Sequence, residues 1–131
     1  MLKIIILGKP REKYVLEGVN EYSKRINKYN KIEILYLKKE EDIVKNSNGV
    51  LIVLDEHGRQ PDSLGFSKIL FERNLTFCIG PAEGFTKDFL KGKQTISLSS
   101  LTLMHQLALV VLLEQVYRGF TILNNEPYHR G

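Results

Sequence analysis

The chain contains one cysteine and only three histidines among its 131 residues. A single cysteine cannot form a disulfide within the chain. Cys78 stands between Phe77 and Ile79, which favours an inert position in a buried strand over a reactive thiol. The histidines lie far apart in the sequence, and no cysteine or histidine spacing matches a zinc site. We therefore expect neither a bound metal nor a redox-active thiol.

Long hydrophobic runs and phosphate-binding glycine motifs are also lacking. No apolar run approaches the roughly 18 residues that a membrane-spanning helix needs. The opening MLKIIILGKPREKY passes from a short apolar run directly into charge, without the cleavage site of a signal peptide. Neither GxGxxG nor GxxxxGK followed by Ser or Thr occurs, which argues against a Rossmann dinucleotide site and a P-loop. We expect a cytoplasmic protein with no membrane partner.

The composition is that of one compact domain spanning residues 1–131, with 43% hydrophobic and 26% charged residues. Nineteen lysines and arginines against fifteen acidic residues give a net charge of +4, a weak indication of a polyanionic partner. Taken alone, a solvated helix face explains the basic residues of the first third better than RNA binding does. These residues are Lys9, Arg11, Lys13, Lys24, Arg25, Lys28 and Lys31.

Hydrophobic periodicity predicts alternating strands and helices. Short apolar runs typical of buried strands occur at residues 3–7, 32–37, 50–54, 75–79 and 95–98. Helices are expected at about residues 12–28, after Ser63 as an N-cap, from Thr86, and at residues 103–118, with a loop at residues 55–62. This alternation is typical of an α/β fold with a largely parallel sheet flanked by helices.

The last helix is apolar almost all round between Leu103 and Arg118. Such a helix avoids water either by lying under the sheet or by packing against a second subunit. In a domain this small we favour the second possibility, a homodimer.

Three loops follow strands and should meet at one sheet edge, where ligands of α/β folds bind. They begin after Leu54, at Gly80 and at Leu98. Glycine lets the backbone approach a ligand, and the start of a helix offers free N–H groups, so a nucleoside or a small polar cofactor would fit. Alternatively Gly80 and Gly84 only make a turn, and Thr102 only caps the last helix.

The chain ends in Tyr128, His129, Arg130 and Gly131. An aromatic face, a titratable ring and a guanidinium together suit a stacked or flipped base. The alternative is a disordered polar tail.

Several of these segments carry a family resemblance. The strings SLSSLTLMHQ, LLEQVYRG and PYHR, together with VLDEHG and FCIGPAEG upstream, resemble the ribosomal RNA large-subunit pseudouridine N3-methyltransferases of the RlmH type. These enzymes are a minimal branch of the SPOUT methyltransferases. The resemblance covers nearly the whole chain, and its terminal block is specific because uncommon residues recur at fixed spacing.

The resemblance implies a deep C-terminal trefoil knot, a rare exception to the rule that chains are un-knotted. It implies a homodimer that uses S-adenosylmethionine to methylate N3 of a pseudouridine in 23S ribosomal RNA, in an assembled ribosome. The implied acceptor-site residues are Tyr128, His129 and Arg130, in part across the dimer. The implied cofactor residues are Leu54, Gly80, Leu98, Ser99, Ser100, Leu101, Thr102 and Leu103.

The acceptor N3 carries an imide proton that must leave before or during attack on the methyl group. His129 is a candidate base for this proton, and Arg118 or Arg130 can stabilise the developing negative charge. Correct positioning of the nucleophile supplies much of the remaining rate. His105 is a weaker candidate, since a histidine at a helix start can serve packing or a local hydrogen bond alone.

Among the departures from the family's pattern, two bear most directly on activity. Pro81 replaces a glycine and removes one N–H from the cofactor loop, and Leu109 stands where relatives often carry an arginine. These departures motivate an alternative hypothesis, a non-catalytic ribosome- or RNA-binding protein that retains the fold. A third possibility is methylation of another RNA nucleotide.

Overall fold

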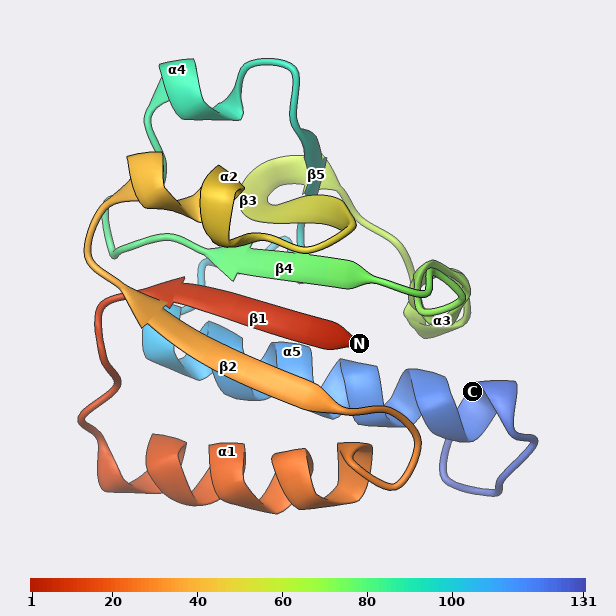
Figure 1. Ribbon diagram of the computed structural model, residues 1–131. Coiled ribbons are helices and arrows are strands. Elements are labelled where there is room, and N and C mark those ends of the chain that lie inside the picture. The colour runs from red at the N-terminus through yellow and green to blue at the C-terminus, as the bar shows by residue number, and fades with distance from the viewer.

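Five strands form one sheet in the order β2-β1-β4-β3-β5, and all four pairings in it are parallel. The computed structural model describes residues 1–131 (Figure 1). Its strands are β1 (Leu2–Leu7), β2 (Ile32–Leu37), β3 (Val50–Arg59), β4 (Leu75–Ile79) and β5 (Gln94–Ile96). Its helices are α1 (Lys13–Ile26), η1 (Glu40–Asp42), α2 (Ile43–Asn46), α3 (Ser63–Ile69), α4 (Lys87–Leu90) and α5 (His105–Leu123). The parallel α/β architecture is confirmed, and the trefoil knot stays a prediction.

Helices cover both faces of the sheet. Figure 1 shows α1 and α5 along one face and α2 and α4 on the other. Alternate residues of β1 therefore enter different cores: Ile4 and Ile6 pack toward α1 and α5, whereas Ile5 belongs to the smaller core on the opposite face. This two-sided burial explains why β1 and β4 are apolar apart from Lys3 and Thr76. Cys78 is fully buried in the smaller core, and burial raises the pKa of its thiol to about 12, as an inert thiol requires.

The predicted loop at residues 55–62 is partly wrong, because β3 continues to Arg59. The ladder between β3 and β5 is interrupted after Leu54 and resumes where Arg59 faces Ile96. Gly58 permits this return, since a Cβ there would stand 2.8 Å from the Ile96 backbone. The strand could not be recognised from hydrophobicity here, because the side chains of this polar segment are not buried in the core.

Two helix boundaries also differ from the sequence-based predictions. Asp62, rather than Ser63, caps α3, and its carboxylate accepts a hydrogen bond of 2.7 Å from the Gly65 N–H. Helix α5 begins at His105 and continues to Leu123, so Thr102 lies before the helix and does not cap it. The predicted end at Arg118 was five residues short, because Gly119 does not end the helix but allows close packing against Leu70 of the segment that follows α3.

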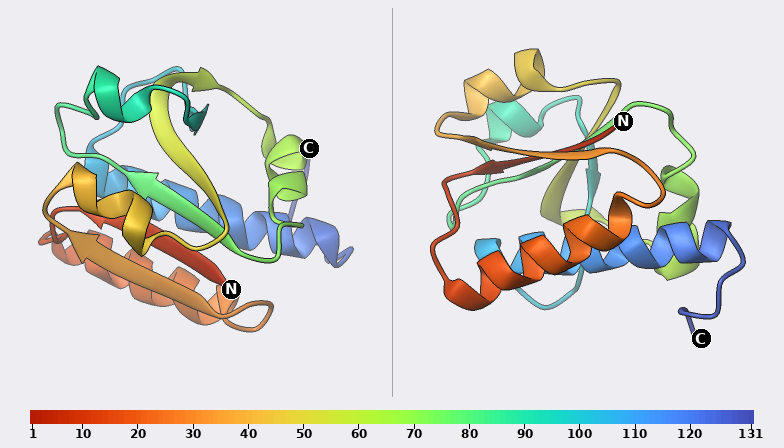
Figure 2. Two further views of the ribbon diagram at one scale, coloured as in Figure 1. Left: turned by 45° about the horizontal axis from the view of Figure 1, so that its top comes forward. Right: turned by 60° about the horizontal axis from the view of Figure 1, so that its bottom comes forward.

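Helix α5 is long and apolar enough, by length and composition alone, to cross a membrane. Its all-round apolar character has another cause, because one side is buried in the protomer's own main core through Leu109, Leu112, Leu113 and Val116. Contacts with α1, α3 and β4 provide this burial, and both views of Figure 2 show α5 running beneath the sheet. The expectation that a second subunit alone accounts for the apolar helix was therefore too simple.

Two independent constraints require glycine at position 49: a left-handed backbone conformation and close contact with a neighbouring backbone segment. The φ of Gly49 is +71°, and an added Cβ would stand 2.0 Å from the Asn74 carbonyl oxygen, which accepts a hydrogen bond from Val50 N–H. Gly92 has a similar φ of +74° but open space around it. In urea unfolding we expect Gly92→Ala to cost about 1–2 kcal/mol, the penalty of the left-handed conformation alone. Gly49→Ala should cost clearly more, and equal losses would contradict the clash.

Candidate functional site

A pocket of about 430 Å³ opens at the carboxyl end of the parallel strands. Its volume lies within the range of small-molecule and cofactor sites. Six of the eight sequence-predicted cofactor residues line it: Leu54, Gly80, Leu98, Leu101, Thr102 and Leu103. The three loops expected to share one edge of the sheet therefore do so.

Ser99 and Ser100, the other two predicted cofactor residues, do not line this pocket. The Ser99 hydroxyl instead accepts a hydrogen bond of 2.9 Å from the Leu101 N–H, and the Ser99 carbonyl accepts one of 2.9 Å from the Ser97 hydroxyl. In this structure Ser99 shapes the loop that presents Leu101 and Thr102. Ser100 is exposed and has no side-chain hydrogen bond.

The extension of β3 contributes acidic groups to the pocket. Asp55, Glu56 and His57 line its wall, and the Asp55 carboxylate accepts a hydrogen bond of 3.2 Å from the His57 N–H. The Thr102 hydroxyl lies 3.4 Å from Glu56 Oε2, which joins the first loop to the third. Sequence reasoning placed the loop here but missed these residues. The signal was present in the VLDEHG string, whose charges directly follow a buried strand.

The glycine loop forms a close backbone wall. A Cβ at Gly80 would stand 3.0–3.2 Å from the Phe85 ring, so glycine lets that ring seat against the loop. The Gly84 N–H donates to the Pro81 carbonyl at 2.8 Å, and Gly84 has a φ of +81°. The loop therefore makes a tight turn and also lines the pocket, so the two interpretations of its glycines are compatible.

The two departures from the family's pattern fall in different places. Pro81 lines the pocket, where it lacks an N–H. Leu109 is fully buried in the main core beneath the sheet. Residue 109 of this chain therefore points into the core and not into the pocket.

His105 starts α5 and contributes to the pocket wall. Its Nδ1 is buried and has no hydrogen-bond partner. The helix-start hydrogen bond considered as its alternative role is thus not formed. A buried acceptor or donor without a partner is uncommon in folded proteins.

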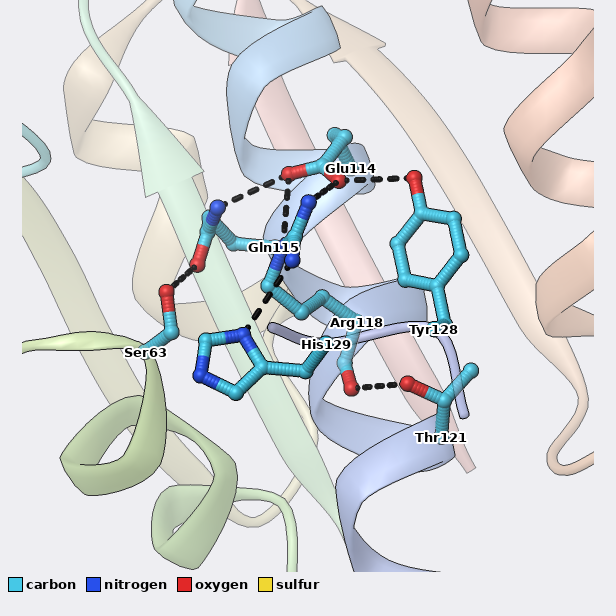
Figure 3. Close-up of polar contacts among 7 residues, drawn as sticks. All are labelled: Ser63, Glu114, Gln115, Arg118, Thr121, Tyr128 and His129. Carbon is cyan, nitrogen blue, oxygen red and sulfur yellow. Dashed lines mark hydrogen bonds and ion pairs between the residues drawn. The ribbon is translucent and has the colours of Figure 1, made fainter. Parts of the chain in front are cut away.

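The terminal residues form a second cluster, around Arg118 (Figure 3). The Arg118 guanidinium pairs with Glu114 at 2.8 Å, contacts His129 Nδ1 at 3.1 Å and lies over the Tyr128 ring, 4.7 Å from its centroid. The Tyr128 hydroxyl donates to Glu114 at 2.9 Å. Three of the four predicted catalytic residues are therefore together, and Arg130 is exposed outside the cluster.

Glu114 connects the members of this cluster, and sequence reasoning missed it. It accepts hydrogen bonds from Arg118, Tyr128 and Gln115, and Gln115 in turn accepts one of 2.7 Å from Ser63. The spacing of Glu114 and Arg118 by four residues is that of a helical ion pair and was the available signal. The hydrogen bond with Glu114 raises the pKa of the Arg118 guanidinium, so the cation is fixed.

The contact with Arg118 also determines what His129 can do. A guanidinium only donates hydrogen bonds, so Nδ1 of His129 is the acceptor and a neutral ring carries its proton on Nε2. In this arrangement His129 offers a hydrogen-bond donor. The base role considered for His129 requires the ring to leave Arg118.

Pocket and cluster lie far apart within one chain. His105 and Arg118 are thirteen residues apart in the same helix, which corresponds to about 20 Å at roughly 1.5 Å per residue. The predicted cofactor and acceptor residues thus form two separate groups in a single protomer.

Comparison with known proteins decides the family. The family described as "Predicted SPOUT methyltransferase" matches residues 1–129. The chain is 38% identical to ribosomal RNA large subunit methyltransferase H of Koribacter versatilis, over 99% of this chain and 98% of that protein. The protein of the same name from Enterococcus faecalis is also 38% identical, over 98% and 99%. The chain belongs to the SPOUT methyltransferase family.

Solved structures agree with this SPOUT fold. The SpoU methyltransferase AviRb of Streptomyces viridochromogenes matches with a TM-score of 0.59 at 12% identity, over 95% of this chain and 61% of that chain. TrmJ of Z. mobilis ZM4 matches with a TM-score of 0.58 at 10% identity, over 99% and 73%. A methyltransferase-like protein of Legionella pneumophila, in complex with the cofactor SAM, matches with 0.54 at 10%, over 88% and 64%.

The terminal cluster of this SPOUT protein should affect how the unfolding free energy depends on pH. Burial, and then the hydrogen bond to Glu114, raise the pKa of Tyr128 from 10.0 to about 12. A raised phenol pKa contributes stability that is complete below pH 10 and is lost as the pH rises toward 12. We expect the unfolding free energy to fall in that window, and Tyr128→Phe should reduce the slope.

Ultraviolet titration of the tyrosines supplies the direct measurement. Glu114→Gln should lower the pKa of Tyr128 toward its ordinary value, because the charged acceptor is lost. Unchanged titration of Tyr128 in that variant would contradict the network.

Proposed function

We propose that this protein transfers a methyl group from S-adenosylmethionine to N3 of a pseudouridine in large-subunit ribosomal RNA. One observation carries the proposal: a cofactor-sized pocket lies where the family resemblance places the cofactor loops. The full-length relatives named ribosomal RNA large subunit methyltransferase H support the choice of substrate. Leu109 no longer supports a non-catalytic protein, because it lies in the core.

The pocket's residues fit the proposed cofactor. Its wall combines apolar side chains with acidic ones, and S-adenosylmethionine carries two cationic groups, a sulfonium and an ammonium. Asp55, Glu56 and Glu83 can attract these cations, while Lys87 can pair with the cofactor's carboxylate. The unpartnered Nδ1 of His105 is a further polar group for which a bound ligand would provide a partner. Bound S-adenosylmethionine supplies an electrophilic methyl group.

The terminal cluster has the chemistry needed at the acceptor. Loss of the N3 proton develops negative charge on the neighbouring carbonyl oxygens, which fixed cations and N–H donors stabilise. Arg118 is a fixed cation, and His129 presents an Nε2–H donor when Arg118 holds its other nitrogen. We assign Arg118, Tyr128 and His129 to the acceptor site, with Arg130 as an exposed cation beside it.

A homodimer would join pocket and cluster into one site. Half-buried positions on one side of α5, including Leu107 and Val111, continue the face that carries Glu114 and Arg118. The midpoint between His105 and Arg118 lies between residues 111 and 112. Two α5 helices that cross antiparallel on this face at that point would each set their Arg118 beside the partner's pocket. Twofold symmetry then completes two equal sites.

The chain carries no separate RNA-binding domain within its 131 residues. We infer that the described domain acts in the cytoplasm on an assembled ribosome, whose folded RNA presents the target nucleotide.

Methyl transfer to ribosomes that lack the modification tests the proposed function. Labelled methyl from S-adenosylmethionine should appear at N3 of one pseudouridine, located by mass spectrometry of the digested RNA. Label on a different nucleotide would refute the assigned acceptor. Absence of both label and calorimetric cofactor binding would favour the non-catalytic RNA-binding protein instead.

Hybrid dimers test whether the site is shared between subunits. Gly80→Val should block the pocket, and a chain with both Arg118→Gln and His129→Ala should lack the acceptor cluster. Each variant alone should be inactive. A hybrid isolated with two different affinity tags has one intact shared site of two, so about half of the wild-type activity should return. An inactive hybrid with native circular dichroism would show that each site forms within one chain.

A further inference from the structure

Three exposed cations, two in the loop between β1 and α1 and one at the first residue of α1, take part in no ion pair or side-chain hydrogen bond. They are Lys9, Arg11 and Lys13, and Glu12 is the one acidic residue among them. Arg25, near the other end of α1, differs because it pairs with Glu21 at 2.8 Å. The loop therefore presents positive charge that nothing in the protomer neutralises.

The loop is held in place despite its exposure. The Gln106 carboxamide oxygen accepts hydrogen bonds from the Arg11 N–H at 3.1 Å and the Glu12 N–H at 3.2 Å. Pro10, which stands between Lys9 and Arg11, is buried. Gly8, with a φ of +94°, donates its N–H to the Leu37 carbonyl at 2.8 Å. Fixed cations bind an anion with a smaller entropic cost than mobile ones.

The position of the clamp places this loop beside the cofactor pocket. Gln106 directly follows His105, which lines the pocket, so the side chain that fixes the loop belongs to the first turn of the same helix. The loop also leaves the carboxyl end of β1, the sheet edge at which the pocket opens. The loop thus lies at the same sheet edge as the pocket and contacts the first turn of α5, although none of its residues lines the pocket.

We propose that Lys9, Arg11 and Lys13 bind backbone phosphates of the RNA strand that carries the target nucleotide. This inference rests on the proposed function, because it gives the acceptor RNA a path to the pocket. An RNA strand supplies a row of single negative charges, which matches a short row of unpaired cations. Phosphate contacts fix the register of a nucleic acid without reading its bases, as a methyltransferase that acts at one nucleotide requires.

A triple variant, Lys9→Gln, Arg11→Gln and Lys13→Gln, removes the charge of this loop. Lys24→Gln, Lys28→Gln and Lys31→Gln form the matched control, since these exposed cations lie toward the other end of α1 or beyond it, and the charge loss is equal. Binding to ribosomal RNA lacking the modification is measured over a range of salt concentrations. The slope of log affinity against log salt should fall by about 2–3 in the loop variant, at roughly 0.7–0.9 per phosphate contact.

The kinetic readout separates this surface from the chemistry. The loop variant should raise the KM for RNA at least tenfold and leave cofactor affinity by calorimetry unchanged, while the control variant should change little. Equal weakening by both variants would overturn the proposal in favour of a general charge effect. RNA binding unaffected by the loop variant would overturn it as well.

The Gln106→Met variant tests the clamp without altering charge. Loss of the carboxamide oxygen should release the loop and weaken RNA binding several-fold, and unchanged RNA binding would refute the clamp's role. The proposed function has its own failure mode: wild-type protein that binds RNA through the loop but transfers no methyl group would refute the activity and leave the surface intact.

Discussion

The packing of α5 beneath the parallel sheet is the constraint on which the rest of this structure depends. Its buried side, with Leu112 and Val116, belongs to the main core and fixes the helix against β4, α1 and α3. Its first residue enters the wall of the cofactor pocket, and its second fixes the basic loop. Thirteen residues further along, Arg118 organises the terminal cluster. One rigid element therefore sets the positions of three functional features.

This dependence explains why the core and the site cannot be separated in so short a chain. A domain of this size buries a smaller share of its surface than a large one, so few elements are available only for function. Helix α5 serves both the core and the candidate site, each with a different side of the helix. The inward side is mainly apolar, with Thr121 as its one buried polar residue, whereas the other side carries Glu114, Gln115 and Arg118. Polar groups on that side are satisfied by one another and by the terminal residues rather than by the core.

Local patterns predicted those parts of the fold in which a single physical requirement acts. The uninterrupted apolar run of β1 indicated a strand buried on both faces, and the three- and four-residue spacing after it indicated α1. Prediction failed where two requirements compete. Asp55, Glu56 and His57 are polar and line the pocket, yet they belong to β3, whose pairing with β5 is interrupted only between Leu54 and Arg59. The inward direction of Leu109 depends on the rotation of α5, which no local pattern specifies.

The candidate site shows the same division. The three loops could be chosen from sequence because parallel strands bring their carboxyl ends to one edge, a rule that needs no coordinates. Ser99 and Ser100 were implied by the family resemblance, yet neither of them lines the pocket in this structure. The role of Glu114 was not predicted from the sequence, because its hydrogen-bond partner Tyr128 lies among the chain's last residues and contacts it only in the folded protein.

The separation of pocket and terminal cluster has a further consequence for how such a small enzyme can assemble a site. A helix cannot bend its own ends together, so a cation about 20 Å along α5 cannot serve the pocket of the same chain. Lengthening the tail would overcome this distance only by ordering many more residues at an entropic cost. A second copy placed antiparallel covers the distance without additional residues. In the proposed homodimer this arrangement would complete the site, and the half-buried side of α5 is the surface on which the two copies would meet.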